Sequence, residues 1–426
     1  MKGRTIIGSS EEGKWKKGMA EKTIILFGTY AEKNTGDDYM LVSQIENIRC
    51  RCPDCRIVVF TANRNHTRQV LQRQEIALTG IRLVYTGRWG LAEPGLVFPG
   101  SFSWFFRNIL EIFRADLLII GPGNQIQDVT RWMRVVFFLS RAVLAWLLHT
   151  PCSFLGIGFF ELRSTFCRRL LRFTGNRAEF FSTRDQGGAD KIREIGVVPK
   201  KIVALADVTF ARRWAPIKGA LAKEEMLIGV TSRIFLPSFF PPPVALNFED
   251  SLATLLRRIH ETYGARFLFF PYYKGSQWKD AVAYDRLVSR LGGDDFPMRP
   301  FPFSTLEELR AGTVRCRAFI GTRYHSVLLS VQNGIPVLGI SYAHKTQRFM
   351  RENGLGEYVV RVEDVSPALL WRTWNKLWDN RESIRGKMAD INARERRLAD
   401  RHFDLVFDTL AAGSSVESPN MASRKL

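Results

Sequence analysis

The sequence has little of what marks secreted, disordered or membrane-spanning proteins. It holds 6 cysteines in 426 residues, and its start lacks a basic-then-apolar leader with a small-residue cleavage site. Both features favour a reducing, unsecreted setting. No stretch reaches the roughly 18 uncharged apolar residues that a membrane span needs, and no repeat or long polar tract is present. We therefore expect a globular cytoplasmic protein with a sizeable core.

Acidic residues are few compared with basic ones. Lys and Arg number 62 against 42 Asp and Glu, which gives a net charge of +20. Such a charge concentrates phosphates, nucleic acid or anionic membrane near a protein. The basic residues are spread over the whole length and do not gather on one element, so nucleic acid is the least favoured of these partners.

One cysteine cluster stands out, formed by Cys50, Cys52 and Cys55. Its spacing would suit part of a zinc site, but no fourth ligand is evident nearby. We interpret the three residues as structural thiols and predict no metal.

The region best suited to a membrane surface covers residues 102–149. Its apolar part from Trp132 to His149 is interrupted by charge, and the basic residues fall on one stripe of a helical wheel: Arg131, Arg134, Arg141 and His149. The favoured interpretation is a buried crossover helix whose polar stripe reaches solvent. The alternative is a helix adsorbed on an anionic membrane at the inner face of the cell envelope.

The length exceeds what one hydrophobic core usually serves, so two domains are expected. Short apolar runs alternate with helix-length segments, which is typical of parallel sheets with helices on both faces. These runs are 23–27, 57–60, 117–120, 152–156, 179–182 and 202–206, then 227–230, 267–270, 318–320 and 336–340. The predicted divisions are a loose tail (1–20), an N-terminal Rossmann-like domain (21–215), a C-terminal Rossmann-like domain (224–362), C-terminal helices (363–412) and a disordered tail (413–426).

In open α/β sheets, ligands bind beyond the carboxyl ends of the strands. The first run leads into Asn34, Gly36, Asp37 and Asp38, at the start of a helix expected near Tyr39. Acids in a first turn complement the helix dipole. The same acids would serve as a base or as an acceptor for a sugar hydroxyl, and the spacing leaves both interpretations open.

Two further turns in the first half follow predicted strands. Gly121 and Gly123 would let the backbone approach a ligand closely. Arg184 offers a planar guanidinium that suits a carboxylate or phosphate. Its structural alternative is an ion pair with Asp185 or Asp207.

The strongest pattern lies in the second half. A strand ends at Gly321, and Arg323 and His325 precede a helix expected to begin near Ser326. A helix amino terminus already favours an anion, Arg adds charge, and His adds a group that moves protons near neutral pH. A merely satisfied Arg–His pair at a helix start is the alternative.

Taken together, these motifs resemble the polysaccharide pyruvyl transferase family over about residues 22 to 360. The resemblance is carried by Asn34-Thr35-Gly36-Asp37, the turn from Gly121 to Asp128, Ser182-Thr183-Arg184-Asp185, Asp207, Gly321-Thr322-Arg323-Tyr324-His325, Gly334-Ile335-Pro336-Val337 and Ser341-Tyr342-Ala343-His344-Lys345.

The resemblance implies two Rossmann-like domains with parallel sheets, arranged like a glycosyltransferase of the B type with a cleft between them. It also implies transfer of pyruvate from phosphoenolpyruvate to two hydroxyls of a sugar, without a cofactor. The donor would contact Arg184, Arg323, the Tyr324 backbone and His325. Substrate binding is further expected from Asn34, Gly36, Gly121, Gly123 and Lys345.

The chemistry assigns His325 as the proton donor to the methylene carbon of phosphoenolpyruvate, and Asp37 or Asp38 as the base for the acceptor. The expected acceptor is a cell-surface polysaccharide or its lipid-linked precursor, which would bring the enzyme to an anionic membrane. Two alternatives remain open: a glycosyltransferase that uses a nucleotide sugar, and a non-catalytic binder of anions or nucleic acid.

Overall fold

The structure is a computed structural model, and it describes residues 22–30, 33–86, 103–128, 132–159, 161–198, 202–216, 226–235, 240–275 and 279–415. The chain divides into two compact units, each described by itself below. Unit 1 comprises residues 1–31, 40–212 and 397–426, and unit 2 comprises residues 32–39 and 213–396. The short segment 32–39 therefore belongs with the second unit, although the sequence places it inside the first domain.

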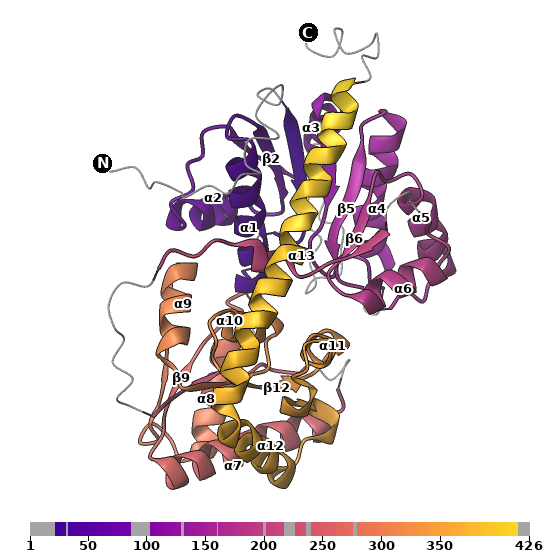
Figure 1. The fold of residues 1–426 in the computed structure, drawn as a ribbon. Coiled ribbons are helices and arrows are strands. Elements are labelled where there is room, and N and C mark those ends of the chain that lie inside the picture. Colours follow the sequence, from indigo (N-terminus) through magenta and orange to yellow (C-terminus); the bar gives the residue numbers. More distant parts are fainter. Residues whose placement is uncertain are drawn as a thin grey trace, which may run out of the picture. The chain divides into compact units, whose positions relative to one another are not determined.

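Unit 1 is built on a seven-stranded parallel sheet of order β3-β2-β1-β4-β5-β6-β7 (Figure 1). Its strands are β1 (Thr23–Phe27), β2 (Arg56–Thr61), β3 (Ile81–Tyr85), β4 (Leu117–Ile120), β5 (Cys152–Ile157), β6 (Phe181–Thr183) and β7 (Ile202–Ala204). Its helices are α1 (Thr35–Arg51, whose first residues lie in unit 2), α2 (Arg64–Arg73), α3 (Ser103–Arg114), α4 (Trp132–Leu147), α5 (Thr165–Gly175), α6 (Gln186–Glu194) and the 3₁₀ turn Val208–Ala211.

Unit 2 repeats the design with a six-stranded parallel sheet of order β10-β9-β8-β11-β12-β13. Its strands are β8 (Leu227–Val230), β9 (Arg266–Phe269), β10 (Met298–Pro300), β11 (Ala318–Gly321), β12 (Val337–Ser341) and β13 (Val359–Arg361). Its helices are α7 (Pro242–Tyr263), α8 (Asp280–Leu291), α9 (Leu306–Arg315), α10 (Tyr324–Gln332), α11 (His344–Glu352), α12 (Pro367–Asp379) and the first part of α13 (Arg381–Ser415), with 3₁₀ turns at Gly356–Tyr358 and Val362–Asp364.

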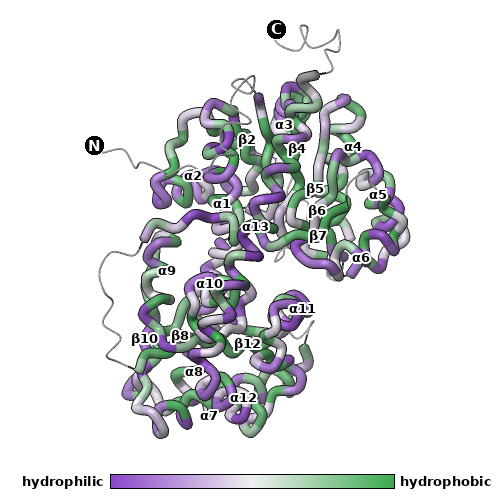
Figure 2. The backbone as a smooth tube through the Cα atoms, viewed as in Figure 1, coloured by the Kyte–Doolittle hydropathy of each residue, from purple (hydrophilic) through white to green (hydrophobic). Residues whose placement is uncertain are grey.

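Strand sequence explains why the sheets are buried. In β1, Ile25 and Phe27 join one core cluster with residues of α3, α4, α5 and α6. Ile24 and Leu26 point to the opposite face and are also fully buried. Continuous apolar strands of this kind are typical of parallel sheets covered on both faces, and the strands are hydrophobic for most of their length (Figure 2).

The predicted two-domain parallel α/β class is confirmed, and every predicted strand overlaps an observed one. The sequence missed β3, β10 and β13, of which β10 and β13 have three residues each and too short a pattern to detect. Helix α1 begins at Thr35 and not near Tyr39. The predicted tail 1–20 lies outside the described residues, and the predicted tail from 413 was wrong for Gly413–Ser415, which continue α13.

The apolar segment of the first half forms α4, which buries one face through Val135, Leu139 and Ala145. The predicted position of Arg141 on a solvent-reaching stripe was wrong. Its side chain is buried, donates to the Thr86 carbonyl oxygen (3.1 Å) and stacks over the Phe137 ring (4.1 Å). Burial lowers the pKa of this guanidinium to about 10. Over the described residues, no helix combines the length and apolar character that crossing a membrane requires.

The cysteine cluster also differs from the expectation. Cys52 and Cys55 form a disulfide, so the interpretation of all three cysteines as thiols was wrong, and Cys50 alone remains a half-buried thiol. In the described part of the chain, no group of three or more His, Cys, Asp or Glu side chains is placed to hold a metal ion.

His402 anchors helix α13 to the sheet of unit 1. It is fully buried, its Nδ1 lies 2.8 Å from Ser182 Oγ, and its Nε2 lies 2.8 Å from the Ala206 carbonyl oxygen. Burial lowers the pKa of this imidazole to about 4. The ring is therefore neutral in the folded protein near neutral pH.

We expect His402 to make the protein less stable as pH falls from about 6.5 to about 4. In this window the unfolded chain binds a proton at His402 and the native state does not, so protons favour unfolding by up to about 1.4 kcal/mol per pH unit. Urea unfolding at several pH values measures this slope. The His402→Gln variant should have a shallower slope, and equal slopes in the two proteins would contradict the assignment.

Candidate functional site

The candidate site of unit 2 lies at the carboxyl ends of its four central strands. Strands β9, β8, β11 and β12 are neighbours in that order, so the residues that follow them meet at one edge of the sheet. Thr231 links two of these ends, because its hydroxyl accepts from the Thr322 backbone N–H (2.9 Å) and lies 3.0 Å from Ser326 Oγ. The loop after β8 and the start of α10 are thereby held together.

Helix α10 begins at Tyr324, with Arg323 in the N-cap position and extended backbone there. Arg323, Tyr324 and His325 therefore lie at a helix amino terminus, as the sequence predicts, two residues earlier than expected. The Tyr324 ring packs edge-on against His325 at 5.2 Å, and Lys345 Nζ lies 5.0 Å from the centre of the Tyr324 ring. Four of the predicted residues are thus brought together.

Arg323, which is partly exposed, forms an ion pair with the buried carboxylate of Asp280, a residue that the sequence analysis missed. The Arg323 Nε donates to Asp280 Oδ2 (3.1 Å), and its Nη2 contacts Asp280 Oδ1. Asp280 has no solvent exposure and also accepts from the backbone N–H groups of Tyr272 and Tyr273 (both 3.0 Å). Burial opposes the charge of Arg323, but Asp280 outweighs it and raises the pKa of the guanidinium.

This pairing changes the role expected for Arg323. Two of its three nitrogen atoms face Asp280, so the planar fork does not point freely at an anion as the sequence suggested. Asp280 lies 43 residues before Arg323, and no local pattern could have linked the two.

The segment 33–39 packs directly on His325. Asn34 forms a β-bridge with Tyr273, and the Thr35 N–H donates to the Tyr272 carbonyl oxygen (2.9 Å). A Cβ added to Gly36 would overlap the imidazole of His325, so only glycine fits there. The sequence analysis placed the Asn34–Asp37 motif in the first domain and predicted no contact with His325, whereas the structure packs Gly36 on the His325 ring within unit 2.

Asp37 lies in the first turn of α1, next to Gly36. Its Oδ2 accepts from Asn34 Nδ2 at 2.9 Å, and Asp38 follows in the same turn. Both acids complement the helix dipole, as the structural interpretation predicts. Their roles toward an acceptor stay predictions.

Arg233 and Tyr342 also belong to this site, although the sequence gave neither a role. Arg233 follows β8 and stacks over the Tyr342 ring at 4.1 Å, and Tyr342 follows β12. Burial opposes ionisation of Tyr342, but the positive charges of Lys345, Arg233 and Arg323 outweigh burial and lower the pKa of the phenol to about 7. The strand-end rule applied to β8 would have found Arg233.

Unit 1 holds the remaining predicted residues. Arg184 is buried, its Nη1 lies 3.6 Å from Asp207 Oδ2, and its Nη2 donates to Asn124 Oδ1 at 2.5 Å. The ion pair with Asp207 that the sequence offered as the structural alternative is therefore present. Asp185 instead caps α6 by accepting from the Gly188 N–H (2.6 Å). A substrate contact by Arg184 stays a prediction.

Gly121 and Gly123 have structural reasons to be glycine. Their φ angles are +121° and +118°, and the peptide bond between Gly121 and Pro122 is cis. A Cβ on Gly121 would overlap the Leu155 carbonyl oxygen. These constraints explain the glycines through packing, so their contact with a substrate also stays a prediction.

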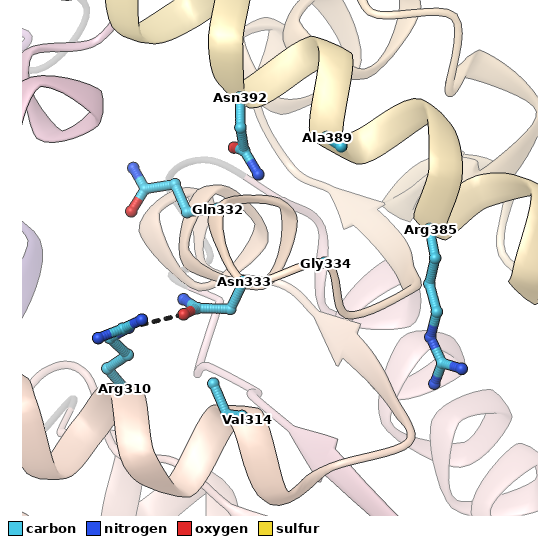
Figure 3. A pocket seen from close by; sticks show the side chains of 8 residues that line it. All are labelled: Arg310, Val314, Gln332, Asn333, Gly334, Arg385, Ala389 and Asn392. Carbon is cyan, nitrogen blue, oxygen red and sulfur yellow. Dashed lines mark hydrogen bonds between the residues drawn. The ribbon is translucent and has the colours of Figure 1, made fainter. Parts of the chain in front are cut away.

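A cavity of about 400 Å³ in unit 2 lies away from these residues (Figure 3). It is lined by α9, by the C-terminal end of α10 and by α13, and Arg310 Nε donates to Asn333 Oδ1 across one side (2.8 Å). His325 and Arg323 lie at the opposite end of α10. We therefore place the candidate site at the strand ends and not in this cavity.

Comparison with known proteins gives matches in sequence and in structure. A model of the polysaccharide pyruvyl transferase family matches residues 34–344. The amylovoran biosynthesis protein AmsJ of Erwinia amylovora is 33% identical over 86 residues, which cover 20% of this chain and 21% of that protein. The chain thus aligns with about a fifth of the length of this curated relative.

Solved structures resemble nearly the whole chain at low identity. HepE of Anabaena in complex with UDP-glucose has a TM-score of 0.54 at 14% identity and covers 92% of this chain and 99% of its own. UDP-GlcNAc 2-epimerase of Neisseria meningitidis bound to UDP-GlcNAc has a TM-score of 0.56 at 10% identity, with coverage of 92% and 100%. MnaA of S. aureus with UDP has a TM-score of 0.56 at 11% identity, with coverage of 89% and 94%.

At these identities the structural likeness concerns the fold alone, and it confirms two Rossmann-like domains of the glycosyltransferase-B-like kind. The family model spans the segment at Asn34, the Arg184 turn and the Arg323–His325 helix start. With the fold and most of the length in agreement, this chain belongs to the polysaccharide pyruvyl transferase family.

Proposed function

We propose that this protein transfers pyruvate from phosphoenolpyruvate to two hydroxyls of a sugar residue, forming a cyclic ketal and releasing phosphate. Family membership supports the reaction class. The family and the similarity to an amylovoran biosynthesis protein support a polysaccharide acceptor, which we take to be a cell-surface polysaccharide or its lipid-linked precursor. The observation that carries the proposal is geometric: Lys345 lies by the Tyr324 ring, which packs on His325, and Arg233 stacks over Tyr342 at the same strand ends.

The electrostatics of the cluster suit this donor. Phosphoenolpyruvate carries a carboxylate and a phosphate close together, so its site needs positive charge. The positive charges of Lys345, Arg233 and Arg323 lower the pKa of the Tyr342 phenol by more than burial raises it. The same charges would hold the donor next to the amino terminus of α10, whose dipole adds to the attraction.

In the proposed reaction, C3 of the donor gains a proton and the bond from C2 to the phosphate oxygen breaks. Two new bonds join C2 to the acceptor oxygens. The two acceptor hydroxyls release two protons. One of them makes up for the proton that was added to C3, and the other leaves with the phosphate. His325 delivers the first proton, and Asp37, oriented by Asn34, accepts from the acceptor hydroxyl. The proposal needs no cofactor, and it retains Arg184, Gly121 and Gly123 as substrate contacts of unit 1.

Replacing His325 by Ala should lower turnover by about 10²- to 10⁴-fold, because the proton donor to C3 is lost. The measurement is phosphate release from phosphoenolpyruvate with candidate oligosaccharides, combined with mass spectrometry for added pyruvate. His66→Ala in α2 is a matched control and should retain full turnover. Unchanged turnover of His325→Ala would remove His325 from the reaction.

A second candidate function is transfer from a nucleotide sugar, because the similar HepE structure is a complex with UDP-glucose. Thermal unfolding with each compound separates the two functions. At 100 times its dissociation constant, a true substrate stabilises the folded state by about 2.7 kcal/mol. We expect phosphoenolpyruvate to raise the midpoint and UDP-glucose to leave it unchanged; the reverse result would favour the glycosyltransferase.

A lipid-linked acceptor would bring the protein to a membrane, and unit 1 offers a surface for this contact. Helices α3, α4 and α5 pack in series and expose large apolar side chains: Phe105, Phe106, Leu110, Phe113, Trp132, Met133, Trp146, Leu147 and Phe166. Exposed arginines accompany them at positions 107 and 114 of α3. Aromatic and basic residues together favour anionic bilayers.

Vesicles that contain phosphatidylserine should retain the protein at low salt, and retention should weaken as salt rises. Replacing Phe105 and Phe106 together by Ser should reduce retention, because both rings are exposed on α3. The control is Leu246→Ser, an equally exposed apolar residue on α7 of unit 2. Equal retention of the Phe105/Phe106 variant and the wild type in a sedimentation assay would exclude this surface.

A further inference from the structure

Arg233 is a half-buried cation enclosed mainly by aromatic side chains. It lies in the loop after β8, and its side chain is enclosed by Phe235 (5.6 Å to the ring centre) and Tyr342 (4.1 Å). Its Nε lies 3.4 Å from the Ile234 carbonyl oxygen. Across the described residues, no Asp or Glu forms an ion pair with Arg233. The Tyr342 side chain also forms a hydrogen bond with Arg233, and aromatic faces attract a cation, but these contacts leave other N–H donors of the guanidinium for a ligand.

The neighbouring Arg323 provides a sharp contrast. Both guanidinium groups follow adjacent strands of one sheet, and Asp280 is bonded to Arg323 and to two backbone N–H groups. Burial and the charge of Arg323 lower the pKa of Arg233, and Tyr342 and Asp280 offset only part of this effect. A partly buried charge that costs free energy is stabilised when an anion binds to it.

We propose that Arg233 binds an oxyanion of the substrate, the carboxylate or the phosphate of phosphoenolpyruvate, while Arg323 is held in place by Asp280. This inference rests on the proposed function for the identity of the donor. The proposal assigns the direct contact with the substrate oxyanion to Arg233, which lies outside the Arg323–His325 motif. Tyr342 forms one wall of the subsite through its ring, and Thr231 fixes the loop that presents Arg233.

The first test compares two arginine variants without substrate. Arg233→Met removes a half-buried charge with which no carboxylate of the described residues forms an ion pair, so its unfolding midpoint should equal or exceed that of the wild type. Arg323→Met leaves Asp280 buried without its cation, so its midpoint should fall. A large fall for Arg233→Met together with unchanged anion affinity would identify Arg233 as a structural cation and overturn the proposal.

The second test measures binding by calorimetry with phosphoenolpyruvate, inorganic phosphate and pyruvate. Arg233→Met should weaken phosphoenolpyruvate binding by about 10- to 100-fold, the usual effect of losing hydrogen bonds to a charged group. Arg233→Lys should recover part of the affinity. Loss of phosphate affinity alone assigns Arg233 to the phosphate, and loss of pyruvate affinity alone assigns it to the carboxylate.

The outcomes separate this inference from the proposed function. If the wild type binds phosphoenolpyruvate and Arg233→Met binds it equally well, the role of Arg233 is wrong and the proposed function stands. If the wild type binds phosphate but not phosphoenolpyruvate, and Arg233→Met loses phosphate, the donor is wrong and the oxyanion site stands. If the wild type binds none of the three compounds, both are overturned.

Discussion

Asp280 carries a carboxylate with no exposure to solvent, and this charge is stable only because Arg323 and two backbone N–H groups surround it. Breaking a buried pair of this kind typically costs about 3–5 kcal/mol. The pair joins the start of α8 to the N-cap of α10 and so fixes the direction of Arg323. The positions of Tyr324 and His325 in the next turn depend on the same N-cap.

Because Asp280 balances the charge of Arg323, the remaining positive charge at these strand ends comes from other residues. Arg233 comes from the loop after β8 and Lys345 from the start of α11, and both act on the Tyr342 phenol. A phenol whose pKa lies near 7 despite burial reports a strongly positive local potential. A positive potential of this kind would attract an anionic ligand.

Close packing fixes the side chains that we propose for proton transfer. Gly36 lies against the imidazole of His325 with no room for a side chain, and Asn34 holds Asp37 in the adjoining turn. Residues more than 280 positions apart in the sequence therefore form one cluster within unit 2. The proposed reaction would depend on such precision, because small displacements of reacting groups reduce rates strongly.

The sequence by itself determined the alternation of strands and helices, the two parallel sheets and the strand-end positions of Arg323 and His325. These follow from local periodicity and from the rule that strand ends carry ligands. Only the tertiary structure decided that Asp280 pairs with Arg323, that Arg184 pairs with Asp207 and that Arg233 has no carboxylate partner among the described residues. The reason is physical: the pairing of buried charges depends on which loops meet at a sheet edge. The number of residues between two loops along the chain does not determine whether they meet.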